Sequence, residues 1–336
     1  MSERRYDRYS GQWVTVATHR QDRTFLPSAH YCPLCPTTGE TTVATEIGRS
    51  DFEIAVFDNR FPSMWPQPPQ PKVTATGGNR IEPAYGRCEV VVYSADHNTT
   101  LAEVGIERLR LLVDVWADRY LVLAAEGHAY VMPFENKGEV IGVTLEHPHG
   151  QIYAFPAVPS RPLRALTTAA EHRASTGRCL HCDVLADELA DGARLVVVTD
   201  GFLAWVPFAP RFPYEVHIAP RTHVSALPDL DEVQRDELAG LLARLLPAYD
   251  RLFGFALPYV MAIQGRPSGG DPQEAGWSGS WAEISHLMVE FTPPHRSENR
   301  LKYLAGAELM GGAFVIDVAP EQAAARLRAA VASDPA

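Results

Sequence analysis

The stretch LEHPHGQIYAFP, residues 145–156, sets three polar side chains at alternate positions in a largely apolar run. They are His147, His149 and Gln151. Successive side chains of an extended chain point to opposite faces, so this period of two predicts a strand with chemistry on one face. A second stretch, SHLMVEFTPP at residues 285–294, has the same outline but keeps only His286. The two stretches together indicate one structural unit used twice.

Other segments recur in the same order in both halves of the chain. Each half runs from a Cys-x-x-Cys pair through an Arg-Phe-Pro tag and a β-rich segment to a long helix and a Tyr-Val-Met segment. The helices are predicted over 100–126 and 229–253, where apolar residues recur at three- and four-residue spacing. Each half is therefore an α+β unit. We expect strands at 88–94, 129–138, 214–220 and 258–265, exposed loops at 66–86 and 265–282, and a final helix at 320–331.

We place the boundary between the halves at residues 158–178, which gives a catalytic unit over 1–165 and a second, non-catalytic unit over 166–336. The second unit is expected to contribute to the sugar-phosphate site. The length of 336 residues is that of about two domains.

Composition limits the class of protein. The net charge of −11 argues against a nucleic-acid partner, since such proteins usually carry a basic face. The first ten residues contain no apolar run, which argues against a signal peptide. The most apolar long window is interrupted by Asp114, Asp118 and Arg119, so no membrane span is expected. Five cysteines without a secretory signal favour a reducing, cytoplasmic compartment.

Overlaying the two halves assembles scattered residues into two ligand sets. Each set contains two cysteines and two histidines, which is complete tetrahedral coordination for zinc in a structural role. The first set is Cys32, Cys35, His97 and His147, and the second is Cys179, Cys182, His223 and His286. The alternative is that His97 caps a turn, His223 lies on the surface and His286 is a core histidine. Recurrence at equivalent positions favours zinc, most clearly for the first set.

The overlay also places His149 opposite Met288 and Gln151 opposite Glu290. The metal-ligating histidine recurs, whereas the second histidine does not, so only the first half is expected to be catalytic. A neutral imidazole is nucleophilic near pH 7 because its pKa is about 6.5. His149 is therefore predicted to attack a phosphorus atom and form a covalent intermediate, with a sugar phosphate as leaving group. Gln151 would donate its amide to a phosphate oxygen.

With these residues in place, the sequence resembles the galactose-1-phosphate uridylyltransferases of the histidine-triad superfamily. The resemblance spans nearly the whole chain and rests on HPHGQIYA, on FENKG, on WVTVATHRQDR, on the ordered CPLC, DHNTTL and HPH series, and on the late EFTPP and LKYLAGAEL. It implies a duplicated histidine-triad fold, with an antiparallel sheet flanked by helices. It also implies a homodimer and a ping-pong exchange of uridylyl between UDP-glucose and galactose 1-phosphate through a uridylyl-histidine at His149.

The resemblance extends to substrate contacts at matching positions. It implies phosphate-facing arginines at Arg20 and Arg23, and base and ribose contacts at Asn59 and Phe61. Further nucleotide contacts are implied at Asn136, Gly142 and Thr144, and hexose-phosphate contacts across a dimer interface at Lys302, Tyr303 and Glu308. The alternatives are a solvated pair of arginines and a Phe61 that packs in the core.

The chain departs from the family pattern in two places. Well-studied members bind iron at a second site, but the matching second-half positions are Gln264, Met288 and Glu290, so no iron is expected. The family's aromatic residue before the late glutamate is Ala307, which leaves the sugar specificity open. Two other functions remain open: a phosphorylase or transferase of the same superfamily acting on ADP-glucose or dinucleoside polyphosphates, and a zinc-stabilised nucleotide-binding protein without turnover.

Overall fold

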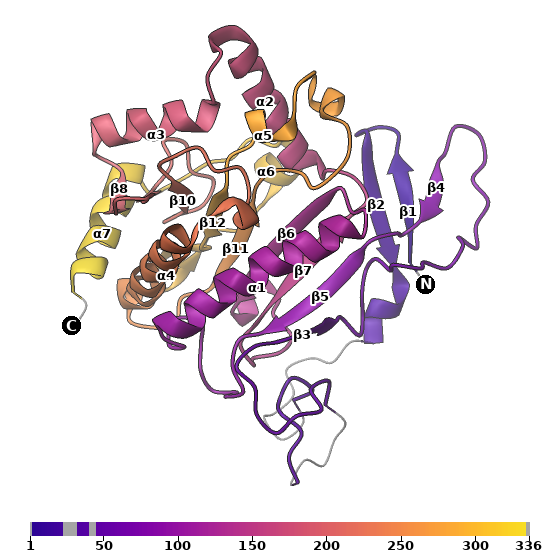
Figure 1. Ribbon diagram of the computed structural model, residues 1–336, viewed down its shortest axis with the longest axis horizontal. Helices are drawn as coiled ribbons and strands as arrows, with labels where there is room; N and C mark the ends of the chain where they lie inside the picture. The colour runs from indigo at the N-terminus through magenta and orange to yellow at the C-terminus, as the bar shows by residue number, and fades with distance from the viewer. Residues whose placement is uncertain (1, 23–31, 40–44, 334–336) are drawn as a thin grey trace.

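The computed structural model describes residues 2–22, 32–39 and 45–333 (Figure 1). A nine-stranded sheet forms its centre, with strand order β3-β5-β7-β6-β11-β12-β10-β9-β8 and antiparallel pairing throughout. The strands are β3 (Ala55–Asp58), β5 (Arg87–Val92), β6 (Tyr130–Lys137), β7 (His149–Phe155), β8 (Leu195–Val198), β9 (Phe202–Trp205), β10 (Val216–Pro220), β11 (Tyr259–Gln264) and β12 (Met288–Thr292). The antiparallel sheet confirms the expected fold class.

The strand order makes the internal repeat visible. The first half contributes β3, β5, β7 and β6, and the second contributes β9, β10, β12 and β11 in the mirrored order, with β8 as an added edge strand. The halves meet where β6 pairs with β11, with Asn136 opposite Val260. The two predicted units therefore share one continuous sheet.

Two long helices, α1 (Ile106–Ala125) and α4 (Glu232–Phe253), lie side by side on one face of this sheet (Figure 1). Their apolar residues at three- and four-residue spacing are buried in the main core, as their periodicity predicts. The first helix begins six residues later than predicted because Gly105, at φ 82°, holds a backbone conformation that ends the helical path. The helix α7 (Pro320–Ala332) packs beside α4, close to its predicted range. No helix in the described ranges is long and apolar enough to cross a membrane.

The segment at which we placed the boundary between the halves, 158–178, is mostly helix. It forms α2 (Ser160–Thr176), which buries Pro162, Leu166 and Ala169 and ends at Gly177. The helix α3 (Leu180–Asp191) follows directly. We did not predict this helix, because the buried positions of α2 are few and separated by polar residues, so its amphipathic pattern is weak in the sequence.

An N-terminal sheet stands beside the main one. Its strands are β1 (Ser2–Asp7), β2 (Gln12–Ala17) and β4 (Ile81–Pro83), so part of the loop predicted at 66–86 is a strand. The loop predicted at 265–282 likewise contains short helices. The remaining elements are η1 (Thr18–Asp22), η3 (Glu139–Ile141), η4 (Leu227–Asp229), η5 (Pro272–Ala275), α5 (Trp281–Ile284), β13 (His295–Ser297), β14 (Arg300–Leu301) and α6 (Gly306–Gly311).

A buried carboxyl group on β6 predicts a pH-dependent stability. Burial raises the pKa of Glu135 from 4.5 to about 7, and the Tyr259 hydroxyl donates to its Oε2 at 3.1 Å. Because the folded pKa exceeds the unfolded one, this group stabilises the fold below pH 4.5, and that contribution is lost as the pH rises towards 7. Replacing Glu135 with Gln should therefore increase the free energy of unfolding relative to wild type, and this increase should be larger at pH 8 than at pH 5. The increases at the two pH values should differ by about 2–3 kcal/mol.

Denaturant unfolding at the two pH values checks this. The exposed Glu139→Gln is the matched control and should show equal effects at both. A Glu135→Gln effect independent of pH would contradict the prediction.

Candidate active site and metal centres

The strand β7 separates a chemical face from a packed face. Ile152 and Ala154 lie in the core beneath α1. The alternate residues His149, Gln151 and Tyr153 are partly exposed on the opposite face of the sheet. The period of two seen in the sequence therefore directs the polar side chains away from the helices and towards an open pocket.

The ring of His149 is fixed by one hydrogen bond. Its Nδ1 lies 2.8 Å from the carbonyl oxygen of His147, and a carbonyl only accepts, so Nδ1 carries the hydrogen. No described residue hydrogen-bonds Nε2. Burial lowers the pKa of His149, which favours the neutral imidazole. The ring thus presents an unprotonated Nε2 in a set orientation, as a nucleophile requires.

The pocket at His149 collects many of the predicted substrate contacts. Arg20, Asn59, Phe61, Thr144 and Gln151 line it together with His149. Asn136 lines an adjoining hollow that also reaches His149. Gly142 ends the short helix η3 at φ 85°, close to Thr144 in the chain. The last three predicted contacts, Lys302, Tyr303 and Glu308, line neither hollow, and Arg23 lies outside the described residues.

A chain of hydrogen bonds fixes which end of Gln151 faces the pocket. The backbone N–H of Phe61 donates to Asn59 Oδ1 at 2.9 Å, which leaves the Asn59 amide nitrogen as donor. That nitrogen donates to Gln151 Oε1 at 3.1 Å. Gln151 therefore keeps its own Nε2 hydrogens for another acceptor, which is the polarity needed to hold a phosphate oxygen.

Replacing Asn59 with Asp should reverse this polarity. A carboxylate cannot donate to Gln151 Oε1, so the Gln151 amide would turn its nitrogen towards the introduced carboxylate and its oxygen towards the phosphate. We expect a loss of about 10- to 100-fold in the rate of transfer to His149, measured by single-turnover labelling. Asn79→Asp, an exposed change of the same charge, is the control and should leave the rate unchanged. A normal rate in the Asn59 variant would contradict the assignment.

One residue that contacts the pocket arginine Arg20 was missed in the sequence. The hydroxyl of Tyr153 accepts a hydrogen bond of 3.1 Å from Arg20 Nη1. Tyr153 continues the alternation of His149 and Gln151, so the period of two carried the signal. Its contact with η1 places the Arg20 guanidinium on the same face of β7 as His149.

The glycine between His149 and Gln151 permits a close approach. A Cβ atom at Gly150 would lie 2.0 Å from the hydroxyl oxygen of Tyr93 and 2.9 Å from the carbonyl oxygen of Phe134. Tyr93 is 1% exposed, so its ring has no room to move. The packing beneath the strand therefore requires glycine at this position.

Replacing Gly150 with Ala should destabilise the fold by about 1–3 kcal/mol through overpacking, and should reduce activity by displacing His149. Removing the hydroxyl in the double variant Gly150→Ala/Tyr93→Phe should recover part of both losses, since the nearest ring atom is then 3.0 Å away. Denaturant unfolding of the four proteins of this cycle measures the coupling. Gly306→Ala, where no atom lies within 4 Å, is the control. Additive effects would show that the two positions do not interact.

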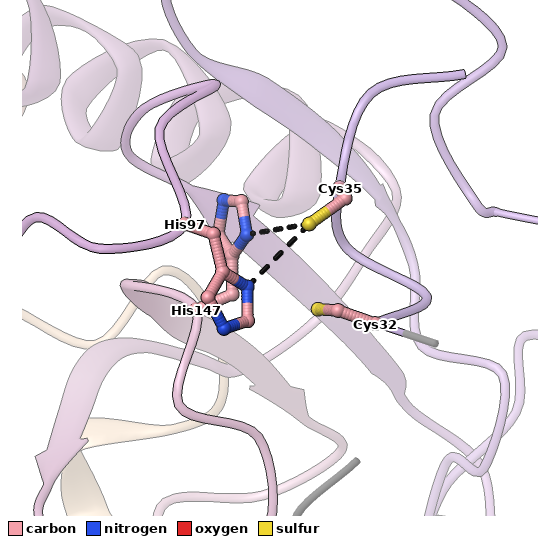
Figure 2. A group of neighbouring side chains, drawn as sticks. All are labelled: Cys32, Cys35, His97 and His147. Carbon is pink, nitrogen blue, oxygen red and sulfur yellow. Dashed lines mark hydrogen bonds between the residues drawn. The ribbon is translucent and has the colours of Figure 1, made fainter. Parts of the chain in front are cut away.

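The first cysteine–histidine set gathers at one end of β7 (Figure 2). Cys35 Sγ lies 3.4 Å from His97 Nδ1 and 3.5 Å from His147 Nδ1, and all four ligand atoms lie within 4.8 Å of one another. The other ring nitrogen of His147 bonds to the carbonyl of Ser94 at 2.8 Å. Each ring nitrogen thus has a separate partner, as in metal-ligating histidines.

The second set has the same arrangement. Cys182 Sγ lies 3.7 Å from the Nδ1 atoms of His223 and His286, and the four ligand atoms again lie within 4.8 Å. The remaining nitrogens of the two rings bond to the carbonyls of Ala282 and Pro220, each at 2.9 Å. The cysteines lie at the start of α3, whereas those of the first set lie in a loop.

The chemistry of both sets fits a metal ion. Two ligands at zinc–sulfur and zinc–nitrogen bond lengths are about 3.5 Å apart in a tetrahedron, close to the distances above. Burial lowers the pKa of His147 and His286 to about 4, so both rings are neutral, as ligation requires. Burial also raises the pKa of Cys35 and Cys182 to about 12, so thiolates at these positions require a cation. Each group can hold a metal ion.

Both halves of the chain match models of one known protein family. Residues 1–159 match the family model described as galactose-1-phosphate uridyl transferase, N-terminal domain, and residues 166–334 match that of its C-terminal domain. The chain belongs to the galactose-1-phosphate uridyl transferase family. Membership in this family of transferases confirms the resemblance and the enzyme class predicted from the sequence.

Individual members of the galactose-1-phosphate uridyl transferase family are similar along the whole chain. The chain is 37% identical to the galactose-1-phosphate uridylyltransferase of Thermotoga maritima, covering 98% of each chain. It is 35% identical to the enzyme of that name from Streptomyces lividans, covering 97% of this chain and 86% of the relative. A solved uridylyltransferase structure superimposes with a TM-score of 0.85 at 32% identity, covering 98% of both chains. Similarity of this extent covers both halves of the chain.

Proposed function

We propose that this chain is a uridylyltransferase that moves a uridylyl group between UDP-glucose and galactose 1-phosphate through a covalent bond to His149. Family membership and the names of the relatives support the substrates. The single observation that carries the mechanism is the His149 ring, whose Nδ1 is bound to the His147 carbonyl and whose Nε2 is unprotonated. His149 lines a pocket with two arginines, Arg20 and Arg60, and with two side-chain amides.

The first half-reaction is an attack of His149 Nε2 on the α-phosphorus of UDP-glucose. The nitrogen–phosphorus bond forms, the bond from phosphorus to the bridging oxygen breaks, and glucose 1-phosphate leaves with the electron pair. The leaving phosphate has a pKa of about 6, so it departs without a strong general acid. Gln151 Nε2 donates to a non-bridging oxygen, and Arg20 is positioned by Tyr153 to balance the developing charge.

The second half-reaction reverses these steps with a different sugar phosphate. A phosphate oxygen of galactose 1-phosphate attacks the same phosphorus, the nitrogen–phosphorus bond breaks, and His149 regains its neutral ring as UDP-galactose forms. The hydrogen stays on Nδ1, which donates it to the His147 carbonyl throughout, so the nitrogen that reacts is always Nε2. Phe61, Asn136, Gly142 and Thr144 remain our candidates for contacts with the nucleotide, as does Arg23 for its phosphates.

We further propose zinc as the metal of both cysteine–histidine sets. Two thiolates and two imidazoles form a closed shell that suits zinc in a structural role. His147 would be a ligand of the first ion, and its carbonyl oxygen orients His149. The metal would therefore support the nucleophile by fixing the chain two residues before it.

The hexose-phosphate contacts require a second copy of the chain in this proposal. Lys302 Nζ is buried and bound to Glu308 at 2.9 Å, and Tyr303 is exposed, away from the hollows at His149. The neighbouring Leu309 and Met310 are 68% and 89% exposed, an apolar surface that a homodimer would cover. We also propose a division into two units at residue 165, a homodimer and a cytoplasmic location. The five free cysteines support the cytoplasmic location.

Isotope exchange between UDP-glucose and labelled glucose 1-phosphate tests the function. The exchange needs only the first half-reaction, so it is independent of the acceptor sugar. We expect exchange without galactose 1-phosphate, together with acid-labile uridylyl label on the protein. Exchange with ADP-glucose alone would favour an adenylyl-transferring enzyme or phosphorylase, and no exchange with either would favour a nucleotide-binding protein without turnover.

A further inference from the structure

A second pocket lies in the other half of the sheet. It is enclosed by α2, β10, β11 and β12, and has a volume of about 400 Å³, within the range of small-molecule sites. We call it the second-half pocket. The residues that matter for its chemistry are Arg161, Arg164, Arg211, His181, Ser285 and Glu290.

The second-half pocket occupies the position that corresponds to the catalytic pocket. Gln151 pairs with Val90 across β7 and β5, and Glu290 pairs with His217 across β12 and β10. Val289 and Phe291, on either side of Glu290, face the core, so Glu290 points to the open face, as Gln151 does. Met288 stands where His149 would be. The second-half pocket therefore has no counterpart of the His149 nucleophile, and its polar residues need another explanation.

The two carboxylates of the second-half pocket are hydrogen-bonded by neighbouring groups. Glu290 Oε2 accepts from Arg161 at 2.6 Å. Glu215 accepts from His217 at 2.9 Å, and from the backbone N–H groups of Arg211 and Phe212 at 2.7 and 3.0 Å. The Arg161 guanidinium therefore balances the charge of Glu290, and three donors hold the Glu215 carboxylate in place.

Two cations and two buried polar atoms of the second-half pocket lack such partners. Arg164 and Arg211 form no ion pair with any described residue, although the Arg211 guanidinium stacks on Phe314 at 5.4 Å. Ser285 is 2% exposed, and its hydroxyl has no hydrogen-bond partner among the described residues. The Nδ1 atom of His181 is also buried, and no described residue forms a hydrogen bond with it. Buried polar groups are nearly always hydrogen-bonded, so these atoms indicate a ligand that completes them.

We propose that the second-half pocket binds a small phosphorylated organic molecule, with its phosphoryl group on Arg164 and Arg211 and its polar body over Ser285 and His181. Two unpaired guanidinium groups match the charge of a phosphoryl dianion and donate to its oxygens in pairs. A ligand carboxylate would match the two arginines less well than a phosphoryl group, because it has only two oxygens and one negative charge. This binding site goes beyond the proposed transferase function, because it contains none of the residues assigned to that reaction.

Equilibrium dialysis with labelled glucose 1-phosphate tests the second-half pocket. Wild type should bind one more equivalent per chain than the double variant Arg164→Gln/Arg211→Gln, whose affinity at this site should fall about 10-fold or more for each arginine lost. Arg173→Gln removes an arginine from the same helix outside the pocket and should bind as wild type does. Identical binding curves for wild type and the double variant would overturn the proposal.

Two competitors separate the phosphoryl group from the sugar. Displacement of the extra equivalent by inorganic phosphate, with no displacement by glucose, supports recognition of the phosphoryl group. Displacement by glucose alone overturns it. The UDP-glucose exchange assay should give the same rate for the double variant as for wild type, so a failure of the transferase proposal is detected separately.

Discussion

Replacing His149 with Ala is expected to reduce UDP-glucose exchange by at least about 10⁴-fold, because removal of a covalent nucleophile abolishes the two-step route. Uridylyl label on the protein should disappear at the same time. The reason is geometric: His149 is the residue of the pocket whose unprotonated nitrogen is held in place by a hydrogen bond on the far side of its ring. Single-turnover labelling and steady-state exchange measure the two losses independently.

Met288→Ala is the matched control for this change. Met288 lies at the position of β12 that corresponds to His149 on β7, and is likewise partly exposed. It should retain exchange and label. Retention of protein-bound label in the His149 variant would place the nucleophile elsewhere and reject the proposed mechanism.

Replacing Cys35 with Ser should remove the proposed zinc ion of the first set. Of the substitutions considered, it should cause the largest decrease in the free energy of unfolding. A structural zinc ion contributes its binding free energy to folding, so we expect a loss of about 3 kcal/mol or more in the free energy of unfolding. Exchange should also fall, since His147 carries the carbonyl that orients His149. Metal content by mass spectrometry, denaturant unfolding and exchange together measure the effect.

Two cysteines provide controls for this variant. Cys88 is buried in β5 outside both sets, so Cys88→Ser should keep both metal ions. Cys182→Ser should lose the second ion and some stability but keep most of the exchange. The reason is that the second set contains His286, which lies two residues before Met288, whereas the first set contains His147, which lies two residues before His149. Equal losses of exchange in the Cys35 and Cys182 variants would show that the metal acts through global stability alone.

The elements that could be predicted are those with strong local patterns. The long helices α1 and α4 have continuous apolar stripes, and α4 also begins at a capping box formed by Asp231 and Gln234. The alternation of β7 identified the face that carries His149 and Gln151. In contrast, α2 was missed because its buried stripe is mostly small or isolated residues. The strand β4 was missed because its register is set by pairing with β1, far away in the chain.

The sequence by itself determined the duplication, the membership of the two cysteine–histidine sets and the asymmetry that singles out His149, because each follows from residue types repeated at matching positions. Only the tertiary structure decided how these residues act. Three features bring together segments that are distant in the sequence. They are the hydrogen bonds that orient the Gln151 amide, the contact of Tyr93 with Gly150, and the unpartnered groups of the second-half pocket. Such contacts depend on how strands align and side chains pack, and short-range periodicity carries no information about either.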